Sequence, residues 1–299
     1  MNDVANPLVS VVIPTYNHAR YLARVLQSVL DQTYVNWEAI VIDNHSTDNT
    51  DEVMASFADP RIIYLKIHNN GVIAASRNAG IRAAKGEWVA FLDSDDWWTV
   101  DKLKVSIAAA EKELVDVVYH DLYIVVKLNQ INFKKKIGGW ALGNNAYKDL
   151  LTNGNALANS SVIIKKIILE KIGGLSEDPA KIAWEDYDCW LKVSQVSGRF
   201  HYIPEVHGFY WQGGGNTLTR KRNLSSLEMI FKIYIQNEFK QPPFWILYQL
   251  GITAFMCREF TKSANALGQL DLMSCSSFEK IKCIILLWVS RILMIANFD

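Results

Sequence analysis

Apolar positions in the first third of the chain alternate between the spacing of strands and the spacing of helices. Apolar runs predict strands at 8–15, 37–43, 62–66 and 88–92. Helical spacing predicts helices between them at 21–31, 48–57 and 72–84, the second opened by Asp48 as N-cap. Strands that alternate with helices are typical of a parallel sheet with helices on its faces. The pattern therefore predicts an α/β fold.

The pattern is less regular beyond residue 100. It predicts a helix at 101–114, a strand at 115–126, helices at 167–172 and 184–197, and strands at 200–203 and 206–211. Between them lies a stretch rich in Gly and Asn at 138–159, and beyond Leu224 the chain is mostly helical. At ~150 residues per domain, 299 residues make one large or two ordinary domains. We expect a catalytic domain at 1–220 and a helical C-terminal region at 221–299.

The last apolar segment, 278–298, is interrupted by charge. Only eight uncharged residues separate Lys282 from Arg291, far fewer than the ~20 that span a bilayer. Two interpretations stay open: a helix packed on the domain, or a helix lying on an anionic membrane surface with Trp288 at headgroup level. Aromatic residues within 242–252 (Phe244, Trp245 and Tyr248) are expected to be exposed and to extend that surface.

Charge and cysteine content narrow the function classes. The chain has 31 basic and 31 acidic side chains and no net charge, which disfavours nucleic acid as a partner. The four cysteines form no Cys-x-x-Cys pair, as is usual in a reduced compartment. The first seven residues lack the basic and apolar regions of a secretory signal. We therefore expect a cytoplasmic location.

In open α/β sheets ligands bind beyond the carboxyl ends of the strands, and three predicted strand ends are polar here. The fourth strand is followed by Asp93, Ser94, Asp95 and Asp96. Three carboxylates so close repel one another unless a cation is present, and Mg²⁺ or Mn²⁺ commonly bridges such carboxylates to substrate phosphates. The cluster therefore suggests a metal-bound nucleoside diphosphate, with a capping turn before the next helix as the alternative.

Other residues extend this hypothesis. Neither Gly-x-Gly-x-x-Gly nor a P-loop follows the first strand, so phosphates would need another cation, for which Arg77 is the candidate unless it is a surface arginine. Glu185 and Asp186 begin a predicted helix. Acidic residues favour that position because of the helix dipole, but a carboxylate there is also suited to deprotonate a hydroxyl.

Five motifs, in this order and spacing, resemble the family 2 glycosyltransferases across roughly 9–220. They are Val-Val-Ile-Pro-Thr-Tyr-Asn at 11–17, Val-Ile-Asp-Asn-His-Ser-Thr-Asp at 41–48, Ser-Arg-Asn-Ala-Gly at 76–80, Phe-Leu-Asp-Ser-Asp-Asp at 91–96 and Trp-Glu-Asp at 184–186. The resemblance implies the type A glycosyltransferase fold, a Rossmann-like mixed sheet, here with a helical C-terminal region. It also implies inverting transfer from a nucleotide sugar with Mn²⁺ or Mg²⁺.

The resemblance assigns roles to individual residues. It implies that donor-binding residues are Thr15, Tyr16, Asn17, Asp43, Arg77, Asp93 and Ser94, with Asp43 near the base. Asp95 and Asp93 would meet the metal, Asp95 as the direct ligand, and Asp186 would be the catalytic base. The sequence departs from the family pattern at Asn44 and His45, and Tyr210-Trp211-Gln212-Gly213 replaces a late Tyr-Arg-x-His motif.

The hypothesis is a metal-dependent hexosyltransferase that moves a sugar, with UDP-sugar favoured as donor, to a glycan or lipid-linked glycan in bacterial surface polysaccharide synthesis. Peripheral contact through 278–298 would hold it at the inner face of the cell membrane. Two alternatives remain: a nucleotidyltransferase, and a catalytically silent protein on the same scaffold that binds sugar or membrane.

Overall fold

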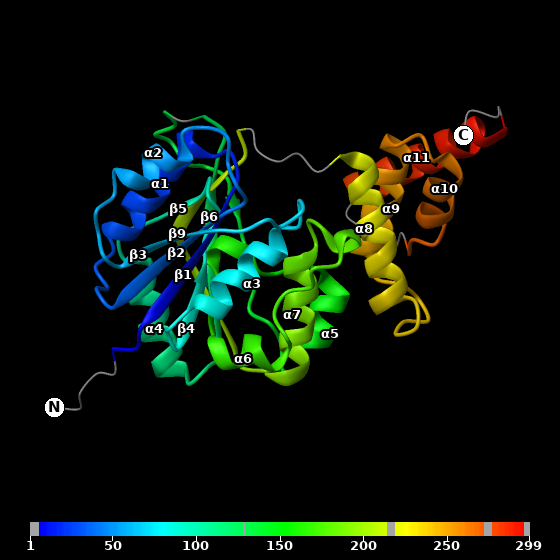
Figure 1. The fold of residues 1–299 in the computed structure, drawn as a ribbon. Coiled ribbons are helices and arrows are strands. Elements are labelled where there is room, and N and C mark those ends of the chain that lie inside the picture. Colours follow the sequence, from blue (N-terminus) through cyan, green and yellow to red (C-terminus); the bar gives the residue numbers. More distant parts are fainter. Residues whose placement is uncertain (1–5, 128, 214–218, 272–276, 296–299) are drawn as a thin grey trace. The chain divides into compact units, whose positions relative to one another are not determined.

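The computed structural model describes residues 6–127, 129–213, 219–271 and 277–295 (Figure 1). The chain forms two compact units. The first comprises residues 1–146, 155–179 and 185–215, and the second comprises 147–154, 180–184 and 216–299. The second unit thus begins at 216 and also includes 147–154 and 180–184, whereas the expected boundary after residue 220 assigned these two segments and 216–220 to the first domain.

One half of the sheet in the first unit is parallel. Its strands are β1 (Val9–Thr15), β2 (Trp37–Asp43), β3 (Ile62–Lys66) and β4 (Trp88–Phe91). They lie in the order β3-β2-β1-β4 and are connected by α1 (Ala19–Leu30), α2 (Thr50–Ala55) and α3 (Ile73–Ala83). The predicted elements are all present within a few residues of their expected bounds. The carboxyl ends of these strands therefore point to one edge of the sheet.

The other half of the sheet is mixed. The order continues from β4 as β8-β6-β9-β5, with β7 paired to β6. The bounds are β5 (Trp97–Trp98), β6 (Val117–Val125), β7 (Lys136–Ile137), β8 (Ile163–Lys165) and β9 (Phe200–Trp211). Strand β8 runs antiparallel to both β4 and β6. In the described part of the chain these strands complete a nine-stranded sheet, and the predicted mixed α/β class is confirmed.

Helices of this half are α4 (Lys102–Glu113), α6 (Lys166–Lys171) and α7 (Glu185–Val196), with a short 3₁₀ helix η1 (Asn159–Ser161) before β8 and another, η2 (Pro179–Lys181), before α7. The two strands expected at 200–203 and 206–211 are one strand, β9. Its register against β6 shifts so that Ile203 pairs with His120 and Val206 with Asp121, which leaves Pro204 and Glu205 as a bulge. Proline is tolerated there because a bulge removes the need for its backbone donor.

The core lies between the parallel strands and their helices. Helix α1 buries Leu22, Val25, Leu26 and Val29 against the sheet, in agreement with its predicted spacing. On α3, Gly80 allows close packing, since a Cβ there would lie 2.5 Å from a methyl carbon of Val12. This close packing holds α3 against β1 and so fixes the positions of the side chains on α3.

The second unit is helical. It contains α5 (Ala146–Asn153), α8 (Arg220–Ile230), η3 (Phe231–Ile235), α9 (Phe244–Met256), α10 (Phe260–Gly268) and α11 (Ser277–Ile295). Residues 296–298 of the predicted last helix lie outside the described residues. Among the described residues, no helix combines the length and the apolar character that a membrane crossing requires.

The expected exposure of the aromatic residues on α9 is wrong. Phe244, Trp245 and Tyr248 are half-buried. Phe244 and Tyr248 pack against the cluster formed by Leu247, Leu267, Leu270 and Cys283, and the Trp245 indole N–H donates to the Leu151 carbonyl. These aromatic side chains therefore contribute volume to the interior of the helical unit.

Candidate active site

The loops that follow β1 and β2 are joined by Asn17. Its backbone has φ of 53°, the left-handed conformation that Asn tolerates better than most residues. The Asn17 amide donates to Ser46 Oγ at 2.8 Å, and its side-chain oxygen accepts from the Thr47 amide at 2.8 Å. Asp48 adds a further connection, since its carboxylate accepts from the Ala19 amide at the start of α1. The two loops therefore form one wall at the carboxyl edge.

Asp43 is fully buried at the end of β2. Its carboxylate accepts hydrogen bonds from the amide of Ser46 at 3.0 Å, from the Ser46 hydroxyl, and from the Tyr64 hydroxyl at 2.9 Å. These contacts order the turn that contains Asn44 and His45, the two residues that differ from the family pattern. Contact between Asp43 and a donor base stays a prediction.

The β1 loop also supplies Thr15, Tyr16 and His18. The Thr15 hydroxyl is buried and has no hydrogen-bond partner among the described residues, whereas the Tyr16 ring is exposed. An orphaned buried hydroxyl is uncommon in proteins and suggests a ligand or water beside it. Nδ1 of His18 is hydrogen-bonded to Ser94 Oγ at 2.8 Å, so Ser94 holds this loop against the acidic cluster. Burial lowers the pKa of His18.

Arg77 is the cation at the centre of the site. Only 3% of it is exposed, and its guanidinium donates to Asp93 Oδ1 at 2.7 Å and to Glu185 Oε1 at 2.6 Å. Burial alone would lower its pKa, but the carboxylates of Asp93 and Glu185 outweigh burial and raise the pKa above its ordinary value. Arg77 therefore connects the end of β4 to the start of α7, and it is not a surface arginine.

The three aspartates after β4 have different environments. Asp96 is buried and accepts from Ser160 Oγ at 2.6 Å and from the Trp211 amide at 2.8 Å. Asp93 is 27% exposed and also accepts from the Asn159 side chain at 3.1 Å. No other described residue donates a hydrogen bond to the half-buried Asp95 carboxylate. Asp96 is thus structural, while the Asp95 carboxylate is bonded only by its own backbone amide among the described residues.

The electrostatics of the cluster favour a cation. Burial, followed by the charge of Asp93, raises the pKa of Asp95 to about 7. Burial also raises the pKa of Asp96 well above its ordinary value. The described residues contain no group of three His, Cys, Asp or Glu side chains placed to hold a metal ion. Asp93 and Asp95 fit Mg²⁺ or Mn²⁺ only as a pair of carboxylates that shares the ion with ligand oxygens such as those of a diphosphate.

Asp186 lies in the first turn of α7, next to the partner of Arg77. It is half-buried; one carboxylate oxygen accepts from the Tyr187 amide at 2.7 Å and the other from the Asn155 side chain at 3.3 Å. Burial, followed by the Glu185 charge, raises its pKa to about 7, although Arg77 opposes the shift. A carboxylate with this pKa exchanges protons readily near neutral pH.

Several residues of the site were missed from sequence. Asn159 and Ser160, which hold Asp93 and Asp96, lie at the end of the stretch rich in Gly and Asn and directly after it, and carry no recognisable signal. The Arg24 guanidinium stacks over the Trp97 ring at 3.5 Å, and burial together with the acidic cluster raises the pKa of Tyr210 to about 12. The sequence indicates Glu185 only as one of two acidic residues at the start of a helix, whereas in the structure it is the buried partner of Arg77.

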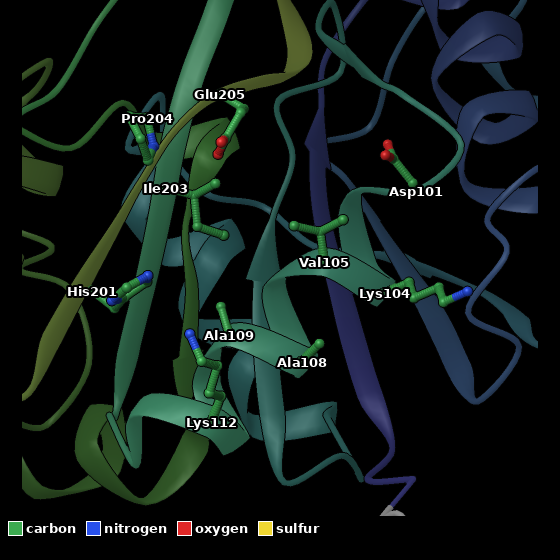
Figure 2. A pocket seen from close by; sticks show the side chains of 10 residues that line it. All are labelled: Asp101, Lys104, Val105, Ala108, Ala109, Lys112, His201, Ile203, Pro204 and Glu205. Atoms are coloured by element: carbon green, nitrogen blue, oxygen red, sulfur yellow. The ribbon is translucent and has the colours of Figure 1, made fainter.

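A separate open pocket of about 620 Å³ lies between α4 and β9 (Figure 2). Its floor is formed by apolar side chains such as Val105, Ala109 and Ile203, and Lys104, Lys112 and Glu205 stand at its sides. None of the predicted site residues lines it. The pocket is therefore distinct from the carboxyl-edge cluster.

Comparison with known proteins identifies relatives over more than half of the chain. The WfgD protein of Escherichia coli, a UDP-Glc:alpha-D-GlcNAc-diphosphoundecaprenol beta-1,3-glucosyltransferase, is 31% identical over 186 residues, which is 62% of this chain and 69% of that protein. WfaP of Escherichia coli, with the same described activity, is 32% identical over 214 residues, covering 72% of this chain and 81% of that protein.

Solved structures share the fold. Staphylococcus aureus TarS 1-349 in complex with UDP has a TM-score of 0.56 at 19% identity, over 92% of this chain and 77% of that one. The mannosyltransferase PcManGT of Pyrobaculum calidifontis, in complex with GDP-Man and Mn²⁺, has a TM-score of 0.60 at 16% identity, over 97% of this chain and 87% of that one. The model of the glycosyl transferase family 2 matches residues 10–163, just over half of the 299 residues. The chain therefore belongs to glycosyl transferase family 2.

Proposed function

We propose that this protein is an inverting hexosyltransferase that moves a sugar from a nucleoside diphosphate, with UDP favoured, to a hydroxyl of a glycan or lipid-linked glycan. The observation that carries the proposal is the buried Arg77, whose guanidinium bonds both Asp93 and Glu185. Arg77 thereby joins the turn at Asp93, which would bind the diphosphate, to the start of α7, where Asp186 has a raised pKa. A donor and an acceptor can then be held side by side.

Donor binding is assigned to the carboxyl edge. Thr15, Tyr16, Asn17 and Asp43 would line the nucleoside pocket, and Asp93 with Asp95 would hold a Mg²⁺ or Mn²⁺ ion. That ion, when bound, supplies Lewis-acid stabilisation of the leaving diphosphate. Arg77 orients Asp93, because its buried guanidinium donates a hydrogen bond to Asp93 Oδ1.

Asp186 is assigned as the general base. Its carboxylate takes the proton of the acceptor hydroxyl while the acceptor oxygen bonds to the anomeric carbon and the bond to the diphosphate breaks. Attack from the face opposite the leaving group inverts the anomeric configuration. The pKa of about 7 supports this role, since a base is most effective when its pKa lies near the working pH.

The donor and acceptor classes are supported by the relatives. WfgD and WfaP are described with UDP-Glc as donor and a diphosphoundecaprenol-linked sugar as acceptor, and TarS was solved with UDP. We infer from them a UDP-sugar donor, a lipid-linked acceptor in surface polysaccharide synthesis, and action at the cytoplasmic face of the membrane. PcManGT was solved with GDP-Man, so GDP is the competing base.

A nucleotide-sugar panel with Mn²⁺ tests the proposal. We expect release of free UDP from a UDP-hexose when a lipid-linked or soluble glycan acceptor is present, and none from Asp95→Asn. Release of pyrophosphate would instead indicate nucleotidyl transfer, and no release from any donor would favour a silent binder. A thermal-shift series with UDP, GDP and dTDP identifies the base, because a nucleotide at ~100 times its dissociation constant stabilises by about 2.7 kcal/mol. A response to GDP alone would overturn the UDP assignment.

A further inference from the structure

Helix α11 (Ser277–Ile295) packs on the second unit through one face. Cys283 and Ser290 are buried, and Leu286 and Leu287 pack against the core cluster of α9 and α10. The hydroxyls of Ser290 and Ser263 are hydrogen-bonded at 3.0 Å. At ~100° per residue these four positions of α11 fall on one side of the helix. The helix is thus anchored to the unit.

The opposite face of α11 is apolar and exposed. Trp288 is 66% exposed, and the other members of this outer face are Ile281, Ile284, Ile285 and Ile292. At ~100° per residue the five side chains fall within a stripe about 100° wide, centred opposite Ser290. Large apolar side chains gathered in this way on a protein surface mark an interaction site, whereas scattered ones do not.

The charges beside the stripe point to the partner. Lys282 and Arg291 are both exposed and flank the stripe, Arg291 about 20° and Lys282 about 60° beyond its edges. The Lys282 ammonium also donates to the Tyr248 hydroxyl of α9 at 3.0 Å. The helix sequence contains three basic residues and one acidic residue, Glu279. An apolar face with Trp and Ile, bordered by basic side chains, is the composition of helices that lie in the headgroup region of anionic bilayers. The absence of a spanning helix in the described residues is consistent with a helix that lies on the surface.

We propose that the outer face of α11 binds the surface of an anionic lipid bilayer, with Trp288 and the isoleucines in the acyl boundary and Arg291 at the phosphates. The helix does not leave its unit, because Cys283 and Ser290 remain on α9 and α10. The proposal combines the two interpretations of 278–298, since one face packs on protein and the other would pack on lipid. The inference does not depend on the transferase activity.

Flotation with vesicles tests the proposal. The full chain should float with vesicles of phosphatidylcholine and phosphatidylglycerol, and at least about tenfold less with phosphatidylcholine alone. Added salt should weaken binding because it screens the headgroup charges. The double variant Ile285→Ser/Trp288→Ser should reduce binding at least about tenfold, as each loses apolar area that the bilayer would bury. Ile131→Ser, which removes an 85% exposed isoleucine of the first unit, is the matched control and should float as the wild type does.

Two further measurements make the outcome decisive. The thermal stability and the UDP-induced thermal shift of the double variant should equal those of the wild type, which separates loss of lipid binding from misfolding or loss of donor binding. Failure of the wild-type chain to float, or equal flotation of the double variant, would overturn the proposal. So would a wild-type dimer in light scattering that the double variant converts to monomer without vesicles, since the stripe would then bind a second copy.

Discussion

Asp186→Asn should have opposite effects on activity and on stability. The variant keeps the shape and an acceptor oxygen for the Tyr187 amide, but it cannot take a proton. Loss of a general base typically costs 10²- to 10⁴-fold, so UDP release with a saturating acceptor should fall within about that range. In the wild type, kcat/KM should fall about tenfold from its plateau on going to pH 6, because the pKa of about 7 leaves roughly a tenth of Asp186 ionised there.

The stability effect follows from the same pKa. Burial raises the pKa of Asp186 from 3.8 to about 7, so between those values the native state binds more protons than the unfolded state. The wild-type free energy of unfolding therefore falls as pH rises through this window, and the cost is fully present above pH 7. A shift of about three units corresponds to at most about 4 kcal/mol. The variant avoids that cost, and its advantage should grow by up to about 2.5 kcal/mol between pH 5 and pH 8.

Urea denaturation at pH 5 and pH 8, without metal or nucleotide, measures the difference. Asp31→Asn, at an exposed carboxyl at the end of α1, is the control, and its free energy of unfolding should differ little from that of the wild type at either pH. A variant less stable than the wild type at pH 8 would refute the reasoning about burial. Near-wild-type transfer by correctly folded Asp186→Asn would refute its assignment as base.

Three further substitutions test the packing and electrostatics of the first unit by urea denaturation. Arg77→Met leaves Glu185 buried without a counter-charge and should lower the free energy of unfolding by about 3–5 kcal/mol. The double variant with Glu185→Gln should recover most of this loss, and equal stability of the single and double variants would contradict the ion-pair argument. Gly80→Ala should destabilise by ~1–3 kcal/mol, because the clash with Val12 exceeds the helix-propensity gain of about 1 kcal/mol; an unchanged midpoint would show that α3 can shift. Asp48→Ala should cost about 0.5–2 kcal/mol, since this carboxylate bonds the first-turn amides of both α1 and α2, and a smaller cost from Asp48→Asn would support capping as the reason.

The sequence was sufficient for the parallel half of the sheet and for the residues at its edge. Strands β2 and β3 have the predicted bounds, because each shows in the sequence as an apolar run that ends in a polar turn; β2 is fully buried and β3 is half-buried at the edge of the sheet. Carboxyl ends of parallel strands share one edge, so the turns at Asn17, Asp43 and Asp93 had to meet there. The predicted N-cap of α2 was one residue early: the helix begins at Thr50 with Asn49 as N-cap, although Asp48 still bonds the Thr50 amide.

Tertiary structure decided the remaining features, because they depend on residues distant in sequence. The strand β8 is only three residues long and carries no periodicity, yet its insertion between β4 and β6 brings Asn159 and Ser160 onto the acidic cluster. Arg77 and Glu185 are 108 positions apart, and nothing in the local sequence of either distinguishes it from an ordinary surface residue. The sequence likewise did not determine which face of α11 packs on protein, because apolar residues have the same helical spacing whether they face protein or lipid. Local sequence fixes the periodicity of an element, whereas the partner of each face is set by long-range packing.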